Sequence, residues 1–338
     1  MPRKNITKKN KQQTKQPNKI IVRKEMSDED IEKKEGHFFD EKHYNRIINQ
    51  DCDVYIKDPS TKKEKLLLSF RKNVIPRNIC CRAYNSLEKE AQKKHNNRGS
   101  AAGLLKASSL PKYVKKTTKK SKFRSYYIGK DGKEKKDHIS NYVKSGIIGY
   151  FDRYDRNAFK KSNGKKISKK NRPSIPCRTT KFTREQVSKW RKTIPLIKYG
   201  NRLFKELVPD RHKIQLKRAK KTPNFQIENT AFSTVTINFN YRTGTHKDRG
   251  DLEEGFGNLI VLEKSECFPG SDSYSGGYLG FPQYKVAVDV RQGDFLAMDV
   301  HEWHTNTKIV PTKKSQTDFG RLSLVCYLRK NMIKCANN

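Results

Sequence analysis

Apolar and polar residues alternate in several short segments of the second half of the chain, which is the pattern of half-buried β-strands. In residues 234–241 one face would carry threonine and asparagine and the other an apolar set made of Val235, Ile237, Phe239 and Tyr241. Further strands are predicted at 257–264, 284–290, 295–300 and 321–329, with a tight turn at 291–294. Closely spaced strands separated by turn signals favour an all-β sandwich, barrel or jelly roll.

The first half of the chain mixes strand and helix signals. Two strands are predicted at 52–57 and 65–71. Residues 85–95 have a helical pattern, and residues 183–207 predict one or two helices that break near Pro195.

We therefore predict an α+β protein whose core is a double-stranded β-helix (jelly roll), with helices from the N-terminal half packed against it. The expected organisation is a disordered basic arm at 1–36, a helical and strand-containing part with Lys-rich loops at 37–224, and the jelly-roll core at 225–332. The Lys-rich stretches are 112–124 and 160–173, and the second is expected to be a mobile loop.

The predicted final strand has one apolar face and one largely polar face. The apolar face carries Leu322, Leu324, Cys326 and Leu328, and the opposite face carries Arg321, Ser323, Val325, Tyr327 and Arg329. Because inward-facing polar residues need water or a ligand to satisfy them, this pattern predicts a wet or ligand-filled cavity rather than a packed core.

The chain is strongly basic, with 75 Lys and Arg against 35 Asp and Glu and a net charge of +40. Self-repulsion of this size favours a polyanionic partner, and nucleic acid is the first candidate because Lys and Arg neutralise phosphates and release counterions. An anionic membrane surface is the second candidate. Without a long apolar run or a signal-peptide-like start, we expect neither a membrane span nor secretion.

Seven cysteines are present, an odd number without a CxxC pair. This pattern argues against a disulfide framework and a structural zinc site. We therefore expect mostly buried free thiols in a reducing compartment, either cytosol or nucleus.

One constellation of residues indicates metal chemistry. His246 and Asp248 are separated by one residue, a distant histidine follows at His301 or His304, and Arg321 opens the final strand. Two histidines and one carboxylate form the facial triad of non-haem Fe(II) oxygenases, which leaves positions open for a co-substrate and O2. An arginine at the cavity mouth could pair with a dicarboxylate. A lone HxD tripeptide is a weak signal, so the order of the motifs carries the hypothesis.

Residues 225–332 resemble the TET/JBP family of 2-oxoglutarate- and Fe(II)-dependent nucleic-acid dioxygenases. The resemblance lies in "HKDRGDLEEGFGNLIVLE", "GDFLAMDVHEWHTNTKI" and "GRLSLVCYLRKNM". Upstream, "NRGSAAG" and "CRTTKFT" are similar to the JBP-like branch of protists, algae and large DNA viruses. The resemblance implies the cofactors Fe(II), 2-oxoglutarate and O2, with ascorbate as a candidate reductant.

The resemblance also assigns individual residues. It implies that His246, Asp248 and His304 hold the iron, because the family's second histidine precedes a small polar run like the one that follows His304 here. Arg321 matches the arginine that binds the distal carboxylate of 2-oxoglutarate, and Ser323 matches a serine beside it. Lys308 departs from the family, which often has proline there.

Three further residues are expected at the substrate base. Asp251 matches a family position that contacts the base edge, Tyr327 lies on the polar face of the final strand, and Arg329 stands where some relatives carry a histidine. A carboxylate can accept from the N4 amino group of cytosine or the N3–H of thymine, so Asp251 does not choose between them.

The reaction implied by the resemblance is hydroxylation of the 5-methyl group of 5-methylcytosine or thymine in DNA, by base flipping and ferryl hydrogen abstraction. The alternatives are a hydroxylase of the same fold that acts on protein side chains or RNA, a variant that uses ascorbate as co-substrate, and a basic nucleic-acid-binding module with an idle iron site. The expected location is the nucleus, or the cytoplasm or host nucleus for a viral protein. Oligomeric state is not predicted.

Overall fold

The computed structural model describes residues 17–110, 112–153, 177–312 and 319–336. Besides short 3-10 turns, its elements are β1 (Asn18–Val22), α1 (Asp28–Lys33), β2 (Arg46–Ile48), β3 (Cys52–Lys57), β4 (Glu64–Arg71), α2 (Arg77–Ala91), β5 (Val114–Lys120), β6 (Ser125–Gly129), β7 (Glu134–Ile139), β8 (Ser145–Phe151), β9 (Arg178–Thr179), α3 (Lys181–Glu185), α4 (Val187–Leu207), α5 (Pro209–Ala219), β10 (Thr234–Phe239), β11 (Gly257–Glu263), α6 (Lys264–Cys267), β12 (Tyr274–Gly276), β13 (Leu279–Phe281), β14 (Val286–Val288), β15 (Phe295–Met298), β16 (Thr305–Asn306), β17 (Ile309–Pro311) and β18 (Arg321–Tyr327).

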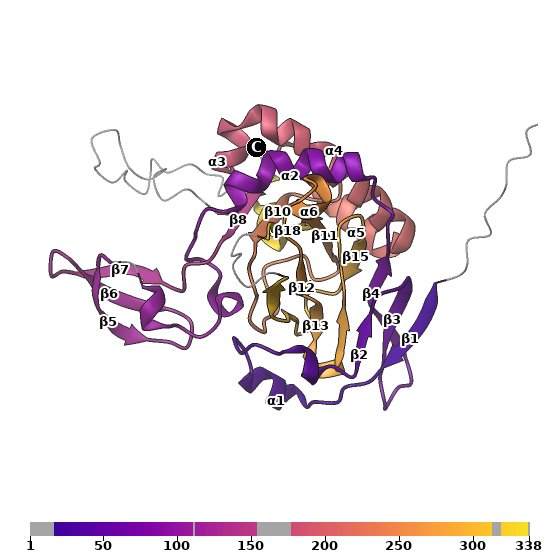
Figure 1. The fold of residues 1–338 in the computed structure, drawn as a ribbon, viewed down its shortest axis with the longest axis horizontal. Coiled ribbons are helices and arrows are strands. Elements are labelled where there is room, and N and C mark those ends of the chain that lie inside the picture. Colours follow the sequence, from indigo (N-terminus) through magenta and orange to yellow (C-terminus); the bar gives the residue numbers. More distant parts are fainter. Residues whose placement is uncertain (1–16, 111, 154–176, 313–318, 337–338) are drawn as a thin grey trace, which may run out of the picture.

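A nine-stranded sheet forms the centre of the fold, in the order β1-β3-β4-β15-β11-β18-β10-β8-β9. Helices α2 and α4 lie over one face of this sheet (Figure 1). The sheet joins strands from both halves of the chain, since β10 pairs antiparallel with both β18 and β8. The expected boundary at residue 225 is therefore not a boundary between separate sheets, and the α+β class is confirmed.

A second sheet of four strands, β16-β13-β14-β2, packs against the other face of the central sheet. Apolar residues of β11 and β15 meet those of β13 and β14 between the two sheets; they include Leu259, Val261, Leu296, Met298, Leu279, Phe281, Val286 and Val288. The protein thus has three layers, with helices, a large sheet and a small sheet.

The predicted alternation along β18 is confirmed. Leu322 and Leu324 are fully buried on the helix side of the sheet, together with Cys326. The alternation along β10 holds only as far as Phe239. Asn240 adopts a positive φ of 45° and turns the chain, so Tyr241 leaves the helix side and lines a cavity on the opposite side.

The N-terminal arm was predicted to be disordered over 1–36, and this is wrong for residues 17–36. Strand β1 pairs in parallel with β3, and α1 follows with Ser27 as its N-cap, whose hydroxyl accepts from the Asp30 N–H at 3.1 Å. Ile31 is fully buried in a cluster that contains Trp303. The partner of this segment lies far away in the sequence, so its polar composition concealed the contact. Residues 1–16 and the predicted loop at 160–173 lie outside the described residues.

Two helix predictions also need correction. Helix α2 begins at Arg77, eight residues before the predicted start, and α4 continues through Pro195 to Leu207. The interruption lies instead at Gln186, between α3 and α4, where the backbone leaves the helical region. No helix in the described ranges is long and apolar enough to cross a membrane.

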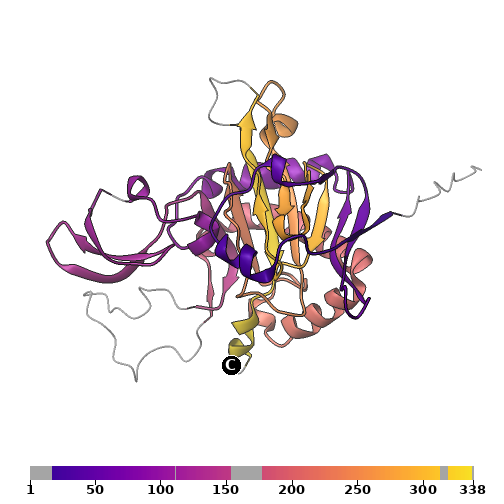
Figure 2. The same ribbon diagram turned by 90° about the horizontal axis from the view of Figure 1, so that it is seen from below.

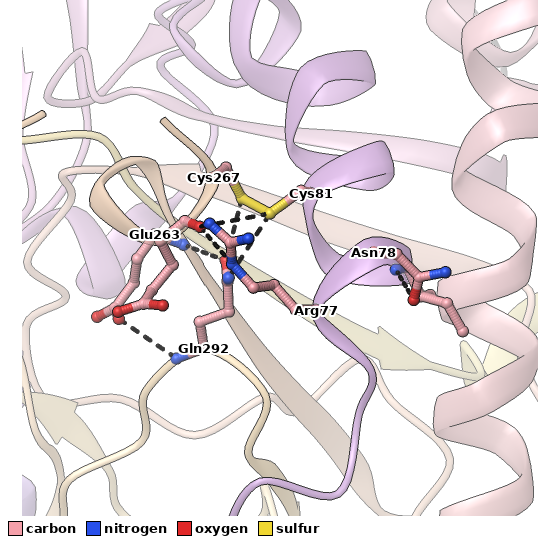
Figure 3. Close-up of a disulfide and its surroundings, with 8 residues drawn as sticks. Arg77, Asn78, Cys81, Glu263, Cys267 and Gln292 are labelled. Atoms are coloured by element: carbon pink, nitrogen blue, oxygen red, sulfur yellow. Dashed lines mark hydrogen bonds between the residues drawn. A yellow bond between two sulfur atoms is a disulfide. The ribbon is translucent and has the colours of Figure 1, made fainter. Parts of the chain in front are cut away.

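The prediction of free thiols is wrong for four cysteines. Cys81 of α2 is joined to Cys267 of α6 by a disulfide (Figure 3), and Cys177 is joined to Cys335. The pairs are 186 and 158 residues apart, so sequence spacing could not reveal them. The remaining cysteines are free and buried; they are Cys52, Cys80 and Cys326.

Replacing Cys267 with serine is expected to lower the free energy of unfolding under oxidising conditions by about 2–4 kcal/mol, because the bridge restricts the unfolded chain. Denaturant unfolding with and without dithiothreitol measures this. Dithiothreitol also opens the Cys177–Cys335 bridge in both proteins, so the difference in stability between wild type and variant should disappear in the reductant. Release of seven reactive thiols from the denatured, unreduced wild type would contradict the pairing.

Candidate metal centre

Two histidines and one aspartate come together at the edge of the space between the two sheets. The backbones of His246 and His304 form a β-bridge, with reciprocal N–H···O bonds of 3.0 Å. Asp248 follows two residues after His246, and its N–H donates to the Val300 carbonyl at 2.9 Å. Two segments 58 positions apart in the sequence are thereby fixed side by side.

The orientation of both imidazoles suits metal binding. The Nδ1 atom of His246 lies 2.8 Å from the Gly244 carbonyl, and that of His304 lies 2.9 Å from the Glu302 carbonyl. Since a carbonyl oxygen only accepts hydrogen bonds, each Nδ1 carries the proton. Each Nε2 is then unprotonated and has a lone pair that can bind a metal ion. Both Nε2 atoms lie 3.7 Å from oxygens of the Asp248 carboxylate.

One donor atom from each of the three residues fits within 4.8 Å of the others, an arrangement that could hold a metal ion. Burial lowers the pKa of His246 to about 4, and the neighbouring His304 acts in the same direction. The imidazole of His246 is therefore neutral near pH 7, which is the form that binds metals. His301 does not join this set, because its Nε2 lies 3.2 Å from the Leu252 carbonyl.

The three residues open onto a cavity of about 220 Å³. The polar face of β18 forms one of its walls, as the sequence predicted. All five residues of that face line the cavity; they are Arg321, Ser323, Val325, Tyr327 and Arg329.

Arg321 is a buried cation at this cavity and is only 2% exposed. Its Nη2 donates to the Gly277 carbonyl at 3.2 Å, while its Nε has no hydrogen-bond partner. Among the described residues, no carboxylate forms an ion pair with Arg321. An uncompensated buried charge is costly, and an anionic ligand bound to the Arg321 guanidinium would offset that cost. Ser323 lies two residues further along the same face and accepts from Asn238 at 3.3 Å.

The three residues expected at a substrate base also meet in this cavity. Arg329 donates through Nε to Asp152 at 3.0 Å, and its Nη1 lies 3.7 Å from Asp251. Burial raises the pKa of Asp251 well above its ordinary value, and the negative charge of Asp248 adds to this while Arg329 opposes it. The Tyr327 hydroxyl lies 3.1 Å from that of Thr236.

A second cation in the cavity, Arg98, was not predicted. Its Nη2 donates to the Gly146 carbonyl at 2.6 Å, and its Nε has no partner. Asn97 and Ser100 line the same wall. The signal available in the sequence was "NRGSAAG", where Gly99 adopts a φ of 52° that brings the loop to the cavity.

Two imidazoles, one carboxylate and an unpaired buried arginine in one cavity fit the facial triad and anion site of a mononuclear non-haem iron oxygenase. Residues 166–330 match the oxygenase domain of the 2OGFeDO superfamily in its Tet/JBP form. The matched stretch is thus similar to the Tet/JBP oxygenase domains, a superfamily whose cofactors are 2-oxoglutarate and Fe(II), and the donor atoms of His246, Asp248 and His304 could hold such a metal ion.

Similar proteins include thymine dioxygenase JBP1 of Trypanosoma brucei brucei, 34% identical over 185 residues that make up 55% of this chain and 19% of that protein. The bifunctional helicase and thymine dioxygenase JBP2 of Leishmania major is 31% identical over 189 residues, 56% of this chain and 15% of that protein. The chain thus spans less than a fifth of either relative. The solved structure of NgTET1 in complex with 5mC DNA aligns over 93% of this chain and 84% of that chain, with a TM-score of 0.48 and 13% identity.

Proposed function

We propose that the protein is a 2-oxoglutarate- and Fe(II)-dependent dioxygenase that hydroxylates the 5-methyl group of a pyrimidine in DNA. The observation that carries the proposal is that the His246–Asp248–His304 set and the unpaired Arg321 line one cavity. The relatives that match this domain are thymine dioxygenases, which supports thymine as the first base to test, with 5-methylcytosine second.

The two facing sheets fit the double-stranded β-helix predicted from the sequence. In this arrangement β10, β11, β15 and β18 supply the larger sheet, and β13, β14 and β16 supply the smaller one. The metal ligands then come from the segments that cross between the sheets, after β10 and before β16.

Each part of the cavity has a distinct role in this proposal. His246, Asp248 and His304 hold Fe(II), while Arg321 pairs with the far carboxylate of 2-oxoglutarate and Ser323 donates beside it. Fe(II) with 2-oxoglutarate and O2 supplies the oxidising power that attack on an unactivated methyl group requires. The buried walls exclude water from this reaction.

The methyl group of a stacked base cannot reach a buried metal, so the target nucleotide must leave the duplex. The edge of the flipped base would meet Asp251 and Arg329, which offer an acceptor and a set of donors. Because Asp152 and Asp251 both contact Arg329, its guanidinium is held in place before the base arrives. Action in the nucleus, or in the host nucleus or cytoplasm for a viral protein, stays a prediction.

Mass spectrometry of nucleosides tests the function directly. Purified protein is incubated with duplex DNA that contains thymine and 5-methylcytosine, with Fe(II), 2-oxoglutarate and ascorbate, and Asp248→Ala serves as the control. The proposal expects 5-hydroxymethyluracil or 5-hydroxymethylcytosine with the wild type alone. Succinate formed with a protein or RNA substrate, and no new nucleoside in DNA, would overturn the DNA assignment while keeping the iron site.

Replacing Asp251 with asparagine is expected to reduce kcat/KM for DNA roughly 5- to 150-fold, since one specific base-edge contact provides about 1–3 kcal/mol of discrimination. The slow turnover of 2-oxoglutarate without DNA should stay unchanged, because Asp251 is not one of the three candidate iron ligands. Steady-state assays of DNA oxidation and of DNA-independent 2-oxoglutarate turnover measure the two rates. Glu253→Gln removes the same charge from an exposed neighbour and should leave both rates unchanged. Equal losses in both rates for Asp251→Asn would place this residue at the metal instead.

A further inference from the structure

A three-stranded sheet stands apart from the three-layered body. Strands β5, β6 and β7 pair only with one another among the described strands, in the order β5-β6-β7. Both ribbon views show this sheet projecting sideways from the body (Figures 1 and 2). We call residues 112–139 the wing. Sequence reasoning treated its first part as a Lys-rich stretch and missed the sheet.

The wing is strongly positive. Residues 112–138 contain eleven Lys and Arg against three Asp and Glu, a net charge of +8. Two of the acidic groups are already engaged within the wing, because Asp131 pairs with Lys135 and Glu134 accepts from Thr118 at 2.6 Å. Exposed lysines that form no ion pair within the described part of the wing include Lys115, Lys116, Lys122, Lys130 and Lys133. Such a concentration of charge requires a polyanion or high salt to offset its self-repulsion.

The inner end of the wing adjoins the wall of the metal cavity. The turn between β5 and β6 contacts the body, where the Leu105 N–H donates to the Lys122 carbonyl at 2.9 Å. The guanidinium of Arg124, at the end of that turn, lies against Gly99. Gly99 directly follows Arg98 and precedes Ser100, and both of these residues line the cavity.

The segment that leaves the wing is fixed to the same loop. The Asn141 side chain donates to the carbonyls of Ala102 and Leu104, at 2.8 and 2.7 Å. Four residues later the chain enters β8 at Ser145, which also lines the cavity. The loop 97–104 therefore connects the basic wing to the cavity wall through hydrogen bonds on both sides.

We propose that the wing is a clamp that binds the sugar–phosphate backbone of duplex DNA beside the nucleotide that enters the cavity. This inference rests on the proposed function, because it takes DNA as the substrate. The seven residues of β5 span about 23 Å at roughly 3.3 Å per residue. A DNA turn is about 34–36 Å long, so one strand of the wing could follow more than half a turn. Lysines act as point charges on phosphates, so the clamp fixes the position of the DNA without reading its sequence.

Fluorescence anisotropy with labelled duplex DNA over a range of salt concentrations tests the clamp on the full chain. The variant Lys115→Gln/Lys116→Gln/Lys122→Gln removes three charges from the wing. The slope of log K against log[salt] should become less steep by roughly 2.7, from about 0.9 for each lost phosphate contact. Lys130 and Lys133 lie in the turn between β6 and β7. The variant Lys130→Gln/Lys133→Gln should make the slope less steep by roughly 1.8, from the same roughly 0.9 for each lost contact. Lys→Arg changes at the first three positions should keep the wild-type slope.

The matched control is Lys213→Gln/Lys217→Gln/Lys220→Gln, which removes three exposed charges at and after α5, on the opposite side of the body in Figure 1. An equal loss of slope in this control, or an unchanged slope in both wing variants, would overturn the clamp. Tighter binding of duplex RNA than of duplex DNA would overturn the choice of partner.

The same samples separate this inference from the proposed function. Oxidised nucleosides from a protein whose DNA binding does not depend on the wing would remove the clamp and keep the reaction. Wing-dependent binding without any oxidised nucleoside would remove the proposed reaction and keep a DNA-binding wing. At low salt, with DNA below saturation, the wing variants should form less product on DNA than the wild type, while their DNA-independent turnover of 2-oxoglutarate equals that of the wild type.

Discussion

Replacing His304 with alanine is expected to abolish oxidation of DNA and to weaken Fe(II) binding by more than the 10- to 100-fold that loss of an outer-shell partner costs. The reason is geometric. The Nε2 atom of His304 faces Asp248 at 3.7 Å, and its Nδ1 is held by the Glu302 carbonyl. Alanine removes one of the three donor atoms and leaves a gap in the set. Anaerobic calorimetric titration with Fe(II), together with the nucleoside assay, measures both effects.

His301→Ala is the matched control, because it removes an imidazole three residues away in the same segment. Its Nε2 lies beside the Leu252 carbonyl and outside the donor set, so iron affinity and product yield should stay close to the wild type. Loss of iron binding in His301→Ala with retention in His304→Ala would reverse the ligand assignment. Loss in neither variant would remove the metal centre from this cavity.

The sequence predicted best those features that depend on local alternation. The two faces of β18 could be read directly, because period 2 along a strand decides which side chains share a face. That single pattern located both the helix-facing core and the polar wall of the cavity. The HxD motif was equally local, since two residues separated by one position point in the same direction.

Features that depend on distant contacts could not be read in this way. Strand β1 is ordered by pairing with β3, and α1 by burial of Ile31 against Trp303. The Cys81–Cys267 bridge joins segments 186 residues apart. Local composition in each case suggested a solvated tail or a free thiol, and the tertiary partner reversed that preference.

The choice between His301 and His304 shows the same limit within the site. Spacing along the chain left both open, and the resemblance to a family favoured His304. In the structure, the β-bridge with His246 brings His304 into the donor set. Arg98 had no comparable pattern, because its position depends on how the loop after α2 meets β8 and β10.

Replacing Arg321 with alanine is expected to raise KM for 2-oxoglutarate roughly 30-fold or more, with Fe(II) affinity unchanged. Truncating one partner of a buried charge pair costs about 2–5 kcal/mol, and 1.4 kcal/mol corresponds to a factor of ten. The same change should not destabilise the cofactor-free protein through lost ion pairing, since no described carboxylate is paired with Arg321. Steady-state kinetics in 2-oxoglutarate and thermal unfolding without cofactors measure the two effects.

Arg291→Ala is the matched control, because Arg291 is a partly buried arginine near the same Tyr274 ring as Arg321. Arg291 already pairs with Asp289 at 2.5 Å and lies 3.6 Å from Glu263, so its removal leaves two carboxylates without their cation. That variant should unfold at a lower temperature and keep its KM for 2-oxoglutarate, the opposite of the Arg321 result. A rise in KM in Arg291→Ala alone would move the anion site to the other arginine. Unchanged kinetics in Arg321→Ala would instead favour a co-substrate other than a dicarboxylate. In that case the guanidinium of Arg321 would not bind the co-substrate.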